Sequence, residues 1–372
     1  MLLLLACSAP TEPERAHTCS APARAPALPP ARGCGDLNCD GTPDLVFART
    51  EDESGNYVTT SVILWGGDPA DTTELPTLGA ADVAVADLDG DDRPDLVFAN
   101  LSDGEVRTVD SYVYWNGPDG FSSENRTALP TVGASDVEVA NLDGDGWRDL
   151  VFANRYDGGS AASDESYQVD VWAYLGGPDG FDASRRLAIP GFGASQTAVA
   201  DFDGDGAMDL AIAAGTFHTN ESWVYFGGDG FAMESRVALA TAAPEGVIAA
   251  DFDDDGWQDV AFANFYAEGD LEIDSAVYWG GPDGFAESTP FPTTGAEPVG
   301  GAADDVRGRA CGGRRRRGRR DRPRVCQPPR RRGERGDRGV ERVLRAWVHG
   351  EHRNPGGAGG GRCGGHAVRN AR

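Results

Sequence analysis

The sequence predicts an all-β protein, a β-propeller built from four-stranded blades with calcium-binding loops. Two observations lead to this fold class. One acidic nine-residue stretch occurs five times with the same internal spacing. Between the copies, at a period of 50 to 60 residues, the chain contains strand-length runs bounded by turn residues and no helical period. Four short strands per unit, repeated at this period, are typical of propeller blades.

The acidic stretch is clearest at residues 201–209, where aspartates occupy the first, third, fifth and ninth positions and glycine the sixth. Hard oxygen ligands crowded in a tight loop suit Ca²⁺, which accepts about six to eight of them. Without a cation, carboxylates this close would repel one another. The seventh residue can add its backbone carbonyl. We therefore predict about one Ca²⁺ per loop. The predicted ligands are Asp36, Asn38, Asp40, Thr42, Asp44, Asp87, Asp89, Asp91, Arg93, Asp95, Asn141, Asp143, Asp145, Trp147, Asp149, Asp201, Asp203, Asp205, Ala207, Asp209, Asp251, Asp253, Asp255, Trp257 and Asp259.

The rest of each unit supplies the remaining strands. An apolar run such as Leu96–Ala99 follows the acidic loop, and an alternating aromatic strand such as Ser111–Trp115 comes next. A Gly-Pro-Asp-Gly-Phe turn leads to a short piece, Arg126–Pro130, and a last strand, Asp136–Ala140, runs into the following acidic loop. The strand aromatics are expected to pack between blades. They are Tyr112, Trp115, Trp172, Tyr225 and Trp279.

The acidic loops and the Tyr-x-Gly-Gly-x-x-Gly-Phe strands resemble the FG-GAP/VCBS repeats of integrin-alpha-like propellers over residues 34–300. The resemblance implies that each loop binds one Ca²⁺ at a hairpin on one face of the disc. It also implies about seven blades, so that five clear repeats indicate a truncated propeller. The first copy has Asn38 and Cys39 inside the loop, and the third begins with Asn141. Weaker calcium sites are expected in these two copies.

The N-terminal residues predict export. Residues 1–7 resemble the remnant of a bacterial lipoprotein signal that ends in Cys7, and a clipped ordinary signal peptide is the alternative. Both interpretations predict a cell-surface lipoprotein or a secreted protein, with membrane contact only through a lipid anchor on Cys7. Residues 8–33 are rich in proline and alanine and are interpreted as a linker.

The basic residues are concentrated at the other end. Residues 301–372 hold 21 of the 33 basic and 7 of the 60 acidic residues, so residues 1–300 carry the acidic excess behind the net charge of -27. A body this acidic repels nucleic acid, and no nucleic-acid partner is expected. We interpret the Arg/Gly-rich tail as a disordered, frameshifted segment, because Arg314–Arg319 can be back-read as Asp-Val-Asp-Gly-Asp-Gly. Loss of the later blades would leave an open sheet edge that favours aggregation. A genuine basic arm is the alternative.

Residue types that support catalysis are sparse within residues 34–300. The only histidine there is His218, in a variable loop, and no Gly-x-Ser-x-Gly elbow occurs. The cysteines lack the histidine partner that a nucleophile needs. A disulfide between Cys34 and Cys39 would fit an oxidising compartment, although a pairing with Cys19 stays open.

Recognition is expected in the variable loops that follow the first strand of each unit, since such loops carry function on rigid scaffolds. Their composition would suit a cell-surface glycan or protein. The sequence therefore predicts an exported, calcium-binding, non-enzymatic adhesion or binding module. The alternatives are a calcium-dependent polysaccharide lyase or hydrolase, and a structural surface protein without a soluble ligand. The candidate loop residues are Asn100, Asn154, Asn264, Tyr156, Tyr167, Phe265 and Tyr266.

Overall fold

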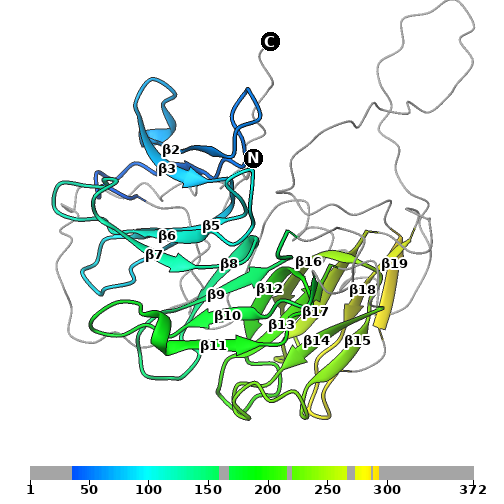
Figure 1. The fold of residues 1–372 in the computed structure, drawn as a ribbon. Helices are drawn as coiled ribbons and strands as arrows, with labels where there is room; N and C mark the ends of the chain where they lie inside the picture. Colours follow the sequence, from blue (N-terminus) through cyan, green and yellow to red (C-terminus); the bar gives the residue numbers. More distant parts are fainter. Residues whose placement is uncertain (1–35, 159–166, 216–219, 266–272, 286–287, 293–372) are drawn as a thin grey trace, which may run out of the picture.

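The computed structural model describes residues 36–158, 167–215, 220–265, 273–285 and 288–292. These residues form nineteen β-strands in five antiparallel sheets that follow one another along the chain (Figure 1). The predicted all-β class is confirmed. In this part of the chain no helix is long and apolar enough to cross a membrane. The predicted signal, linker and Arg-rich tail, together with His218, lie outside the described residues and stay predictions.

Sheets 2 to 5 each contain four strands, hydrogen-bonded to one another in chain order. The strands that precede the acidic loops therefore belong to the same sheet as the strands that follow them. Sheet 2 contains β4 (Ala80–Ala86), β5 (Asp95–Asn100), β6 (Asp110–Tyr114) and β7 (Arg126–Pro130); sheet 3 contains β8 (Ala134–Ala140), β9 (Asp149–Asn154), β10 (Val171–Tyr174) and β11 (Arg186–Ile189). Sheet 4 contains β12 (Ala194–Ala200), β13 (Asp209–Ala214), β14 (Glu221–Tyr225) and β15 (Val237–Ala240); sheet 5 contains β16 (Pro244–Ala250), β17 (Asp259–Asn264), β18 (Asp274–Tyr278) and β19 (Ser288–Pro292).

Sheet 1 differs from the other four. It has three strands, β1 (Leu45–Phe47), β2 (Val58–Leu64) and β3 (Thr72–Leu78), with a short 3-10 turn η1 (Trp65–Gly67) after β2. Sheet 1 thus shows three of the four strands expected in each blade. The segment before Asp36, which corresponds to the first strand of the other sheets, lies outside the described residues. No closed sheet is found among the described strands, so propeller closure stays a prediction.

The second strand of each complete sheet is buried on both faces. All six residues of β5, β9, β13 and β17 are buried, which explains why these segments are continuous apolar runs instead of alternating ones. The burial comes from the neighbouring sheets, because consecutive sheets pack face to face. The first strands β4, β8, β12 and β16 lie beside one another, which brings successive sheets into contact.

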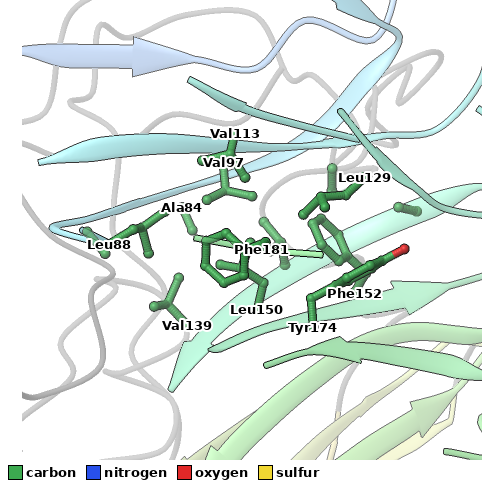
Figure 2. Close-up of a cluster of buried hydrophobic side chains, with 14 residues drawn as sticks. Ala84, Leu88, Val97, Val113, Leu129, Val139, Leu150, Phe152, Tyr174 and Phe181 are labelled. Carbon is green, nitrogen blue, oxygen red and sulfur yellow. The ribbon is translucent and has the colours of Figure 1, made fainter. Parts of the chain in front are cut away.

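Figure 2 shows one of these junctions, between sheets 2 and 3. Val97 and Val113 from sheet 2 face Leu150 and Phe152 from sheet 3 within a single buried cluster. Phe181, from the turn after β10, lies in the same cluster. Burial of apolar side chains on both faces of each sheet is the main stabilising contribution of this architecture.

The phenylalanine that closes each Gly-rich turn has the same role in sheets 2 to 5. Its ring packs into the junction with the preceding sheet, next to residues of both sheets. The four rings are Phe121, Phe181, Phe231 and Phe285. In sheet 1 the corresponding turn, Gly66–Asp71, contains no phenylalanine. The phenylalanine of the turn motif therefore contributes to the apolar packing between neighbouring sheets.

The prediction that strand aromatics pack between blades is confirmed for four of the five side chains. Tyr112 lies at the junction of sheets 1 and 2, Trp115 and Trp172 at that of sheets 2 and 3, and Tyr225 at that of sheets 3 and 4. Trp279 packs against a cluster formed by sheet 5 alone.

Candidate metal centres

The five acidic stretches are the sharp connections at one end of the sheets. We call them loop 1 (Asp36–Asp44), loop 2 (Asp87–Asp95), loop 3 (Asn141–Asp149), loop 4 (Asp201–Asp209) and loop 5 (Asp251–Asp259). Loops 2 to 5 each join the first strand of a sheet to the second, and the ninth loop residue begins the second strand. The residue before the loop pairs with that ninth residue, as Ala140 does with Asp149. The strand pairing therefore closes each loop.

Two backbone positions in every loop have a left-handed conformation. The fourth residue has φ between 58° and 78° and the sixth has φ between 67° and 98°. Glycine is favoured at such positions because it has no Cβ. Three of these ten positions carry a residue other than glycine, namely Cys39 and Asp254 at the fourth position and Asp92 at the sixth. The left-handed conformation at the fourth position and the aspartate at Asp92 were not predicted from the sequence.

The carboxylates at the first, third and fifth positions hold the loop backbone. In loop 4 the Asp201 carboxylate accepts hydrogen bonds from the N–H groups of Gly204 at 2.8 Å and Gly206 at 3.1 Å. The Asp205 carboxylate accepts one from the N–H of Ala207 at 2.7 Å. Each of these bonds fixes one carboxylate oxygen and leaves lone pairs for a further partner.

The ninth aspartate links its loop to the turn that follows the third strand. One Asp209 oxygen accepts a hydrogen bond from the N–H of Phe202 at 2.8 Å, and the other from the N–H of Gly227 at 2.8 Å. The same pair of bonds recurs in all five repeats. The remaining ninth residues and their donors are Asp44 with Leu37 and Gly66, Asp95 with Leu88 and Asn116, Asp149 with Leu142 and Gly176, and Asp259 with Phe252 and Gly280.

These ninth carboxylates are buried at the base of the loops. Burial raises the pKa of Asp95 and of Asp259 to about 7, although the backbone donors oppose the shift. Burial likewise raises the pKa of Asp149 and of Asp209 to about 6. The neighbouring loop aspartates add to these shifts through repulsion between like charges. A cation beside such carboxylates would favour their charged form.

In three loops the structure brings the predicted ligands together. One oxygen from each of three aspartates lies within 4.8 Å of the others in loops 2, 4 and 5. In loop 2, the Asp92 Oδ2 atom is also buried without a hydrogen-bond partner among the described residues. This donor set of closely spaced carboxylates fits a hard divalent cation such as Ca²⁺. The three groups are Asp87, Asp89 and Asp95; Asp201, Asp203 and Asp209; and Asp251, Asp253 and Asp255.

Loops 1 and 3 are less well supplied with carboxylates. Each has an asparagine in place of one aspartate, and neither forms such a trio among the described residues. The expectation that these two loops bind calcium more weakly stays a prediction. Beside loop 1 lies an open hollow of about 480 Å³, lined in part by Asn38, Asp40 and Trp65. Cys39 is disulfide-bonded, and its expected partner Cys34 lies outside the described residues.

The seventh residues contribute through their backbone. Their N–H groups donate to the fifth carboxylate in every loop, as Trp257 does to Asp255 at 2.9 Å. The predicted use of their carbonyl oxygens as ligands is not tested and stays a prediction. The five seventh residues are Thr42, Arg93, Trp147, Ala207 and Trp257.

The interpretation of the recurrent asparagines as recognition residues is wrong. Asn154 is fully buried at the end of β9, where its side-chain oxygen accepts a hydrogen bond from the N–H of Val132 at 2.9 Å. Its amide nitrogen donates to the Asp170 carbonyl at 2.8 Å. Asn100 and Asn264 make the corresponding bonds. These asparagines fasten loops to the sheet end, and their recurrence at one repeat position was the signal for this role.

The aromatic loop residues are placed more favourably for recognition. Tyr156 and Tyr167 lie with ring centres 5.7 Å apart, and the Arg107 guanidinium lies 4.5 Å above the Tyr156 ring. Both tyrosines are partly exposed, at the end of the sheets opposite the acidic loops. Tyr266 lies outside the described residues.

The fold and loops define a repeat protein of antiparallel sheets joined by acidic hairpin loops. The FG-GAP-like repeat matches four overlapping segments, residues 36–98, 87–152, 141–212 and 201–262. Together these segments cover more than half of the chain, and the protein belongs to the FG-GAP-like repeat family.

Among solved structures, the chain is similar to the V. cholerae biofilm matrix protein Bap1, with 17% sequence identity and a TM-score of 0.38. The alignment covers 69% of this chain and 38% of that protein, so the chain spans well under half of Bap1. No curated protein is similar enough in sequence to match the chain.

Proposed function

We propose that this chain is an exported, calcium-stabilised β-propeller module that binds a glycan or protein at the cell surface and is not an enzyme. The observation that carries the proposal is the clustering of three aspartate oxygens within 4.8 Å in each of loops 2, 4 and 5. Membership of the FG-GAP-like family supports it, because all five loops lie within or at the edge of the matched repeats.

The propeller interpretation is supported by the way consecutive sheets pack. Each sheet from 2 to 5 lies face to face with the preceding one, with shared apolar clusters at every junction. The first strands of sheets 2 to 5 lie on one side, next to one another. Continued rotation of further sheets in the same sense would produce a closed ring.

The non-enzymatic interpretation is supported by the roles of the loop carboxylates. The most obvious acid pairs, such as Asp201 and Asp209, are engaged in holding loop backbone and in forming the candidate cation site. A general acid or base needs a carboxylate that is free to exchange a proton with substrate. The proposed recognition surface is the opposite end of the sheets, where Arg107, Tyr156 and Tyr167 lie together.

The calcium part of the proposal is tested by calorimetric titration of the metal-free full chain. We expect saturable binding of several Ca²⁺ ions per chain. The double variant Asp201→Asn, Asp251→Asn is expected to lose about two tight sites, because it neutralises the first ligand of loops 4 and 5. Asp119→Asn, which neutralises an exposed aspartate in a turn outside the loops, is the matched control and should bind as wild type. Absence of saturable binding in the wild type would overturn the proposal.

The recognition part is tested by binding the calcium-loaded chain to a glycan array and to polysaccharide-coated beads. Retention that is lost with Arg107→Ala and Tyr156→Ala would support the opposite end of the sheets as the contact surface. Release of reducing ends or of unsaturated sugars from any polysaccharide in the same panel would identify the chain as an enzyme instead.

A further inference from the structure

Loop 2 contains a positively charged side chain, that of Arg93, which contacts one of the predicted calcium ligands. The Arg93 guanidinium forms an ion pair with the Asp91 carboxylate through Nη2 and Oδ2. The Nε of Arg93 donates to the Asn116 carbonyl at 2.7 Å, which fixes the side chain between the loop and the turn after β6. The other Asp91 oxygen accepts a hydrogen bond from the backbone N–H of Arg93 at 2.9 Å. Both oxygens of this predicted ligand are therefore engaged by one arginine.

The turn that holds Arg93 is itself anchored. The N–H of Asn116 donates to Asp95 at 2.8 Å, and its side-chain nitrogen donates to the Leu37 carbonyl of loop 1 at 2.6 Å. Less than one third of the Arg93 and Asp91 side chains is exposed. An ion pair in such a partly buried and anchored position is stronger than one on an open surface.

The other loops lack this arrangement. The seventh residue is Thr42, Trp147, Ala207 or Trp257, and none of these carries a positive charge. In loop 3 an arginine from the following turn, Arg185, comes only to 3.9 Å from Asp145. In loops 4 and 5 no described basic side chain forms an ion pair with an aspartate at the first, third, fifth or ninth position.

We propose that Arg93 is a built-in counter-ion that holds Asp91 in place of a calcium ion. Loop 2 then keeps its closed shape without metal and binds Ca²⁺ more weakly than loops 4 and 5. The reason is competition, because Ca²⁺ can use the Asp91 Oδ2 atom only after the guanidinium has released it. The inference rests on the proposed calcium function. It adds that, as the calcium concentration rises, loops 4 and 5 bind Ca²⁺ before loop 2 does.

Hydrogen–deuterium exchange of the full chain measures the protection of the backbone amides of each loop separately. The measured quantity is the calcium concentration at which exchange in a loop is slowed by half. We expect this midpoint to be about tenfold higher for loop 2 than for loops 4 and 5, since a charged hydrogen bond must be broken. In metal-free buffer, loop 2 should exchange more slowly than the other two.

Variants of the seventh residue test the cause. Arg93→Gln should lower the loop 2 midpoint about tenfold and leave loops 4 and 5 unchanged, and Arg93→Lys, which keeps the charge, should keep the midpoint high. Ala207→Arg should raise the loop 4 midpoint by a similar factor. Arg49→Gln removes the same charge outside the loops and should change no midpoint.

The outcomes separate the two proposals. If no loop of the wild type responds to calcium, the proposed function fails. If loops 4 and 5 respond but loop 2 fills at the same concentration, or if neither Arg93→Gln nor Ala207→Arg shifts its own loop, the calcium function stands and the role of Arg93 is refuted.

Discussion

The hydroxyl of Tyr225 donates a hydrogen bond to the carbonyl of Pro190, 2.8 Å away, and thereby ties sheet 4 to the last strand of sheet 3. The same bond recurs at the other three junctions. The third strand of each sheet supplies the tyrosine, and the end of the preceding sheet supplies the carbonyl. These pairs are Tyr114 with Pro76, Tyr174 with Pro130, and Tyr278 with Ala240. One residue per repeat thus fixes the position of neighbouring sheets.

Tyr225→Phe is expected to lower the free energy of unfolding by about 1–2 kcal/mol, because it leaves the Pro190 carbonyl without its donor and removes the acceptor of the Arg236 guanidinium. Urea unfolding followed by tryptophan fluorescence measures the change. Tyr57→Phe, at a half-exposed tyrosine in a loop, is the control and should change stability by less than about 0.5 kcal/mol. Equal effects of the two variants would show that the bond between the sheets adds nothing specific.

Removal of calcium should destabilise the whole chain. A ligand that binds only the folded state stabilises it by mass action, by about 2.7 kcal/mol per site at a hundredfold excess over Kd. We expect the melting temperature to fall by several degrees or more when EDTA replaces calcium, and to return when calcium is restored. Differential scanning calorimetry makes the measurement, with magnesium as the control ion. A melting temperature that does not depend on calcium would contradict the metal assignment.

Variants of two loop 4 aspartates, Asp209 and Asp203, should distinguish a structural role from a metal-binding role. Asp209→Ala deprives the Phe202 and Gly227 N–H groups of their acceptor, and an orphaned buried donor costs roughly 1–3 kcal/mol. This loss is expected in EDTA as well as in calcium. Asp203 is exposed and accepts a single, exposed hydrogen bond, from the Asp205 N–H at 3.1 Å. Asp203→Ala should therefore lower the melting temperature only slightly in EDTA and much more in the presence of calcium. If both variants depend on calcium to the same extent, the ninth position has no structural role of its own.

The sequence predicted the parts of this fold that depend on periodic patterns. Short apolar runs and alternating aromatic runs located the strands, and the spacing of aspartates located the hairpin loops. Hydrogen bonds between distant segments were not predictable in this way. Asn154 forms hydrogen bonds with the backbone of Val132 and Asp170. Asn, Ser and Asp are common both in exposed turns and at buried positions where they bond to the backbone, so residue type alone does not distinguish the two roles. The double role of the ninth aspartate was hidden for the same reason, because its second donor is 18 or more residues further along the chain.

Substitution of Asn154 should therefore lower stability and leave ligand binding unchanged, whereas substitution of a ligand-binding residue would do the reverse. Asn154→Ala should lower the free energy of unfolding by about 2–3 kcal/mol, since it breaks two hydrogen bonds of a buried side chain and leaves their backbone partners unsatisfied. Chemical unfolding measures the loss. Glycan or protein binding by the remaining folded fraction should equal that of the wild type. A fully stable variant that has lost binding would return this residue to the recognition surface.

Glycine in place of Asp92 should stabilise the metal-free protein. Asp92 has φ of 67° at the position where the other four loops carry glycine at 87° to 98°. Its Oδ2 atom is buried without a hydrogen-bond partner among the described residues. Asp92→Gly relieves both the left-handed strain and the unpaired oxygen, and we expect a gain of about 1 kcal/mol in EDTA.

The matched control is Gly206→Asp, which places the same residue at the sixth position of loop 4 and should cost a similar amount, because Gly206 has φ of 92°. Urea unfolding of both variants in EDTA and in calcium completes the test. A destabilised Asp92→Gly protein in calcium alone would mean that the Asp92 carboxylate helps to hold the ion. Loss of stability in EDTA as well would show that the carboxylate has a partner within the folded chain, and the strain argument would then be wrong.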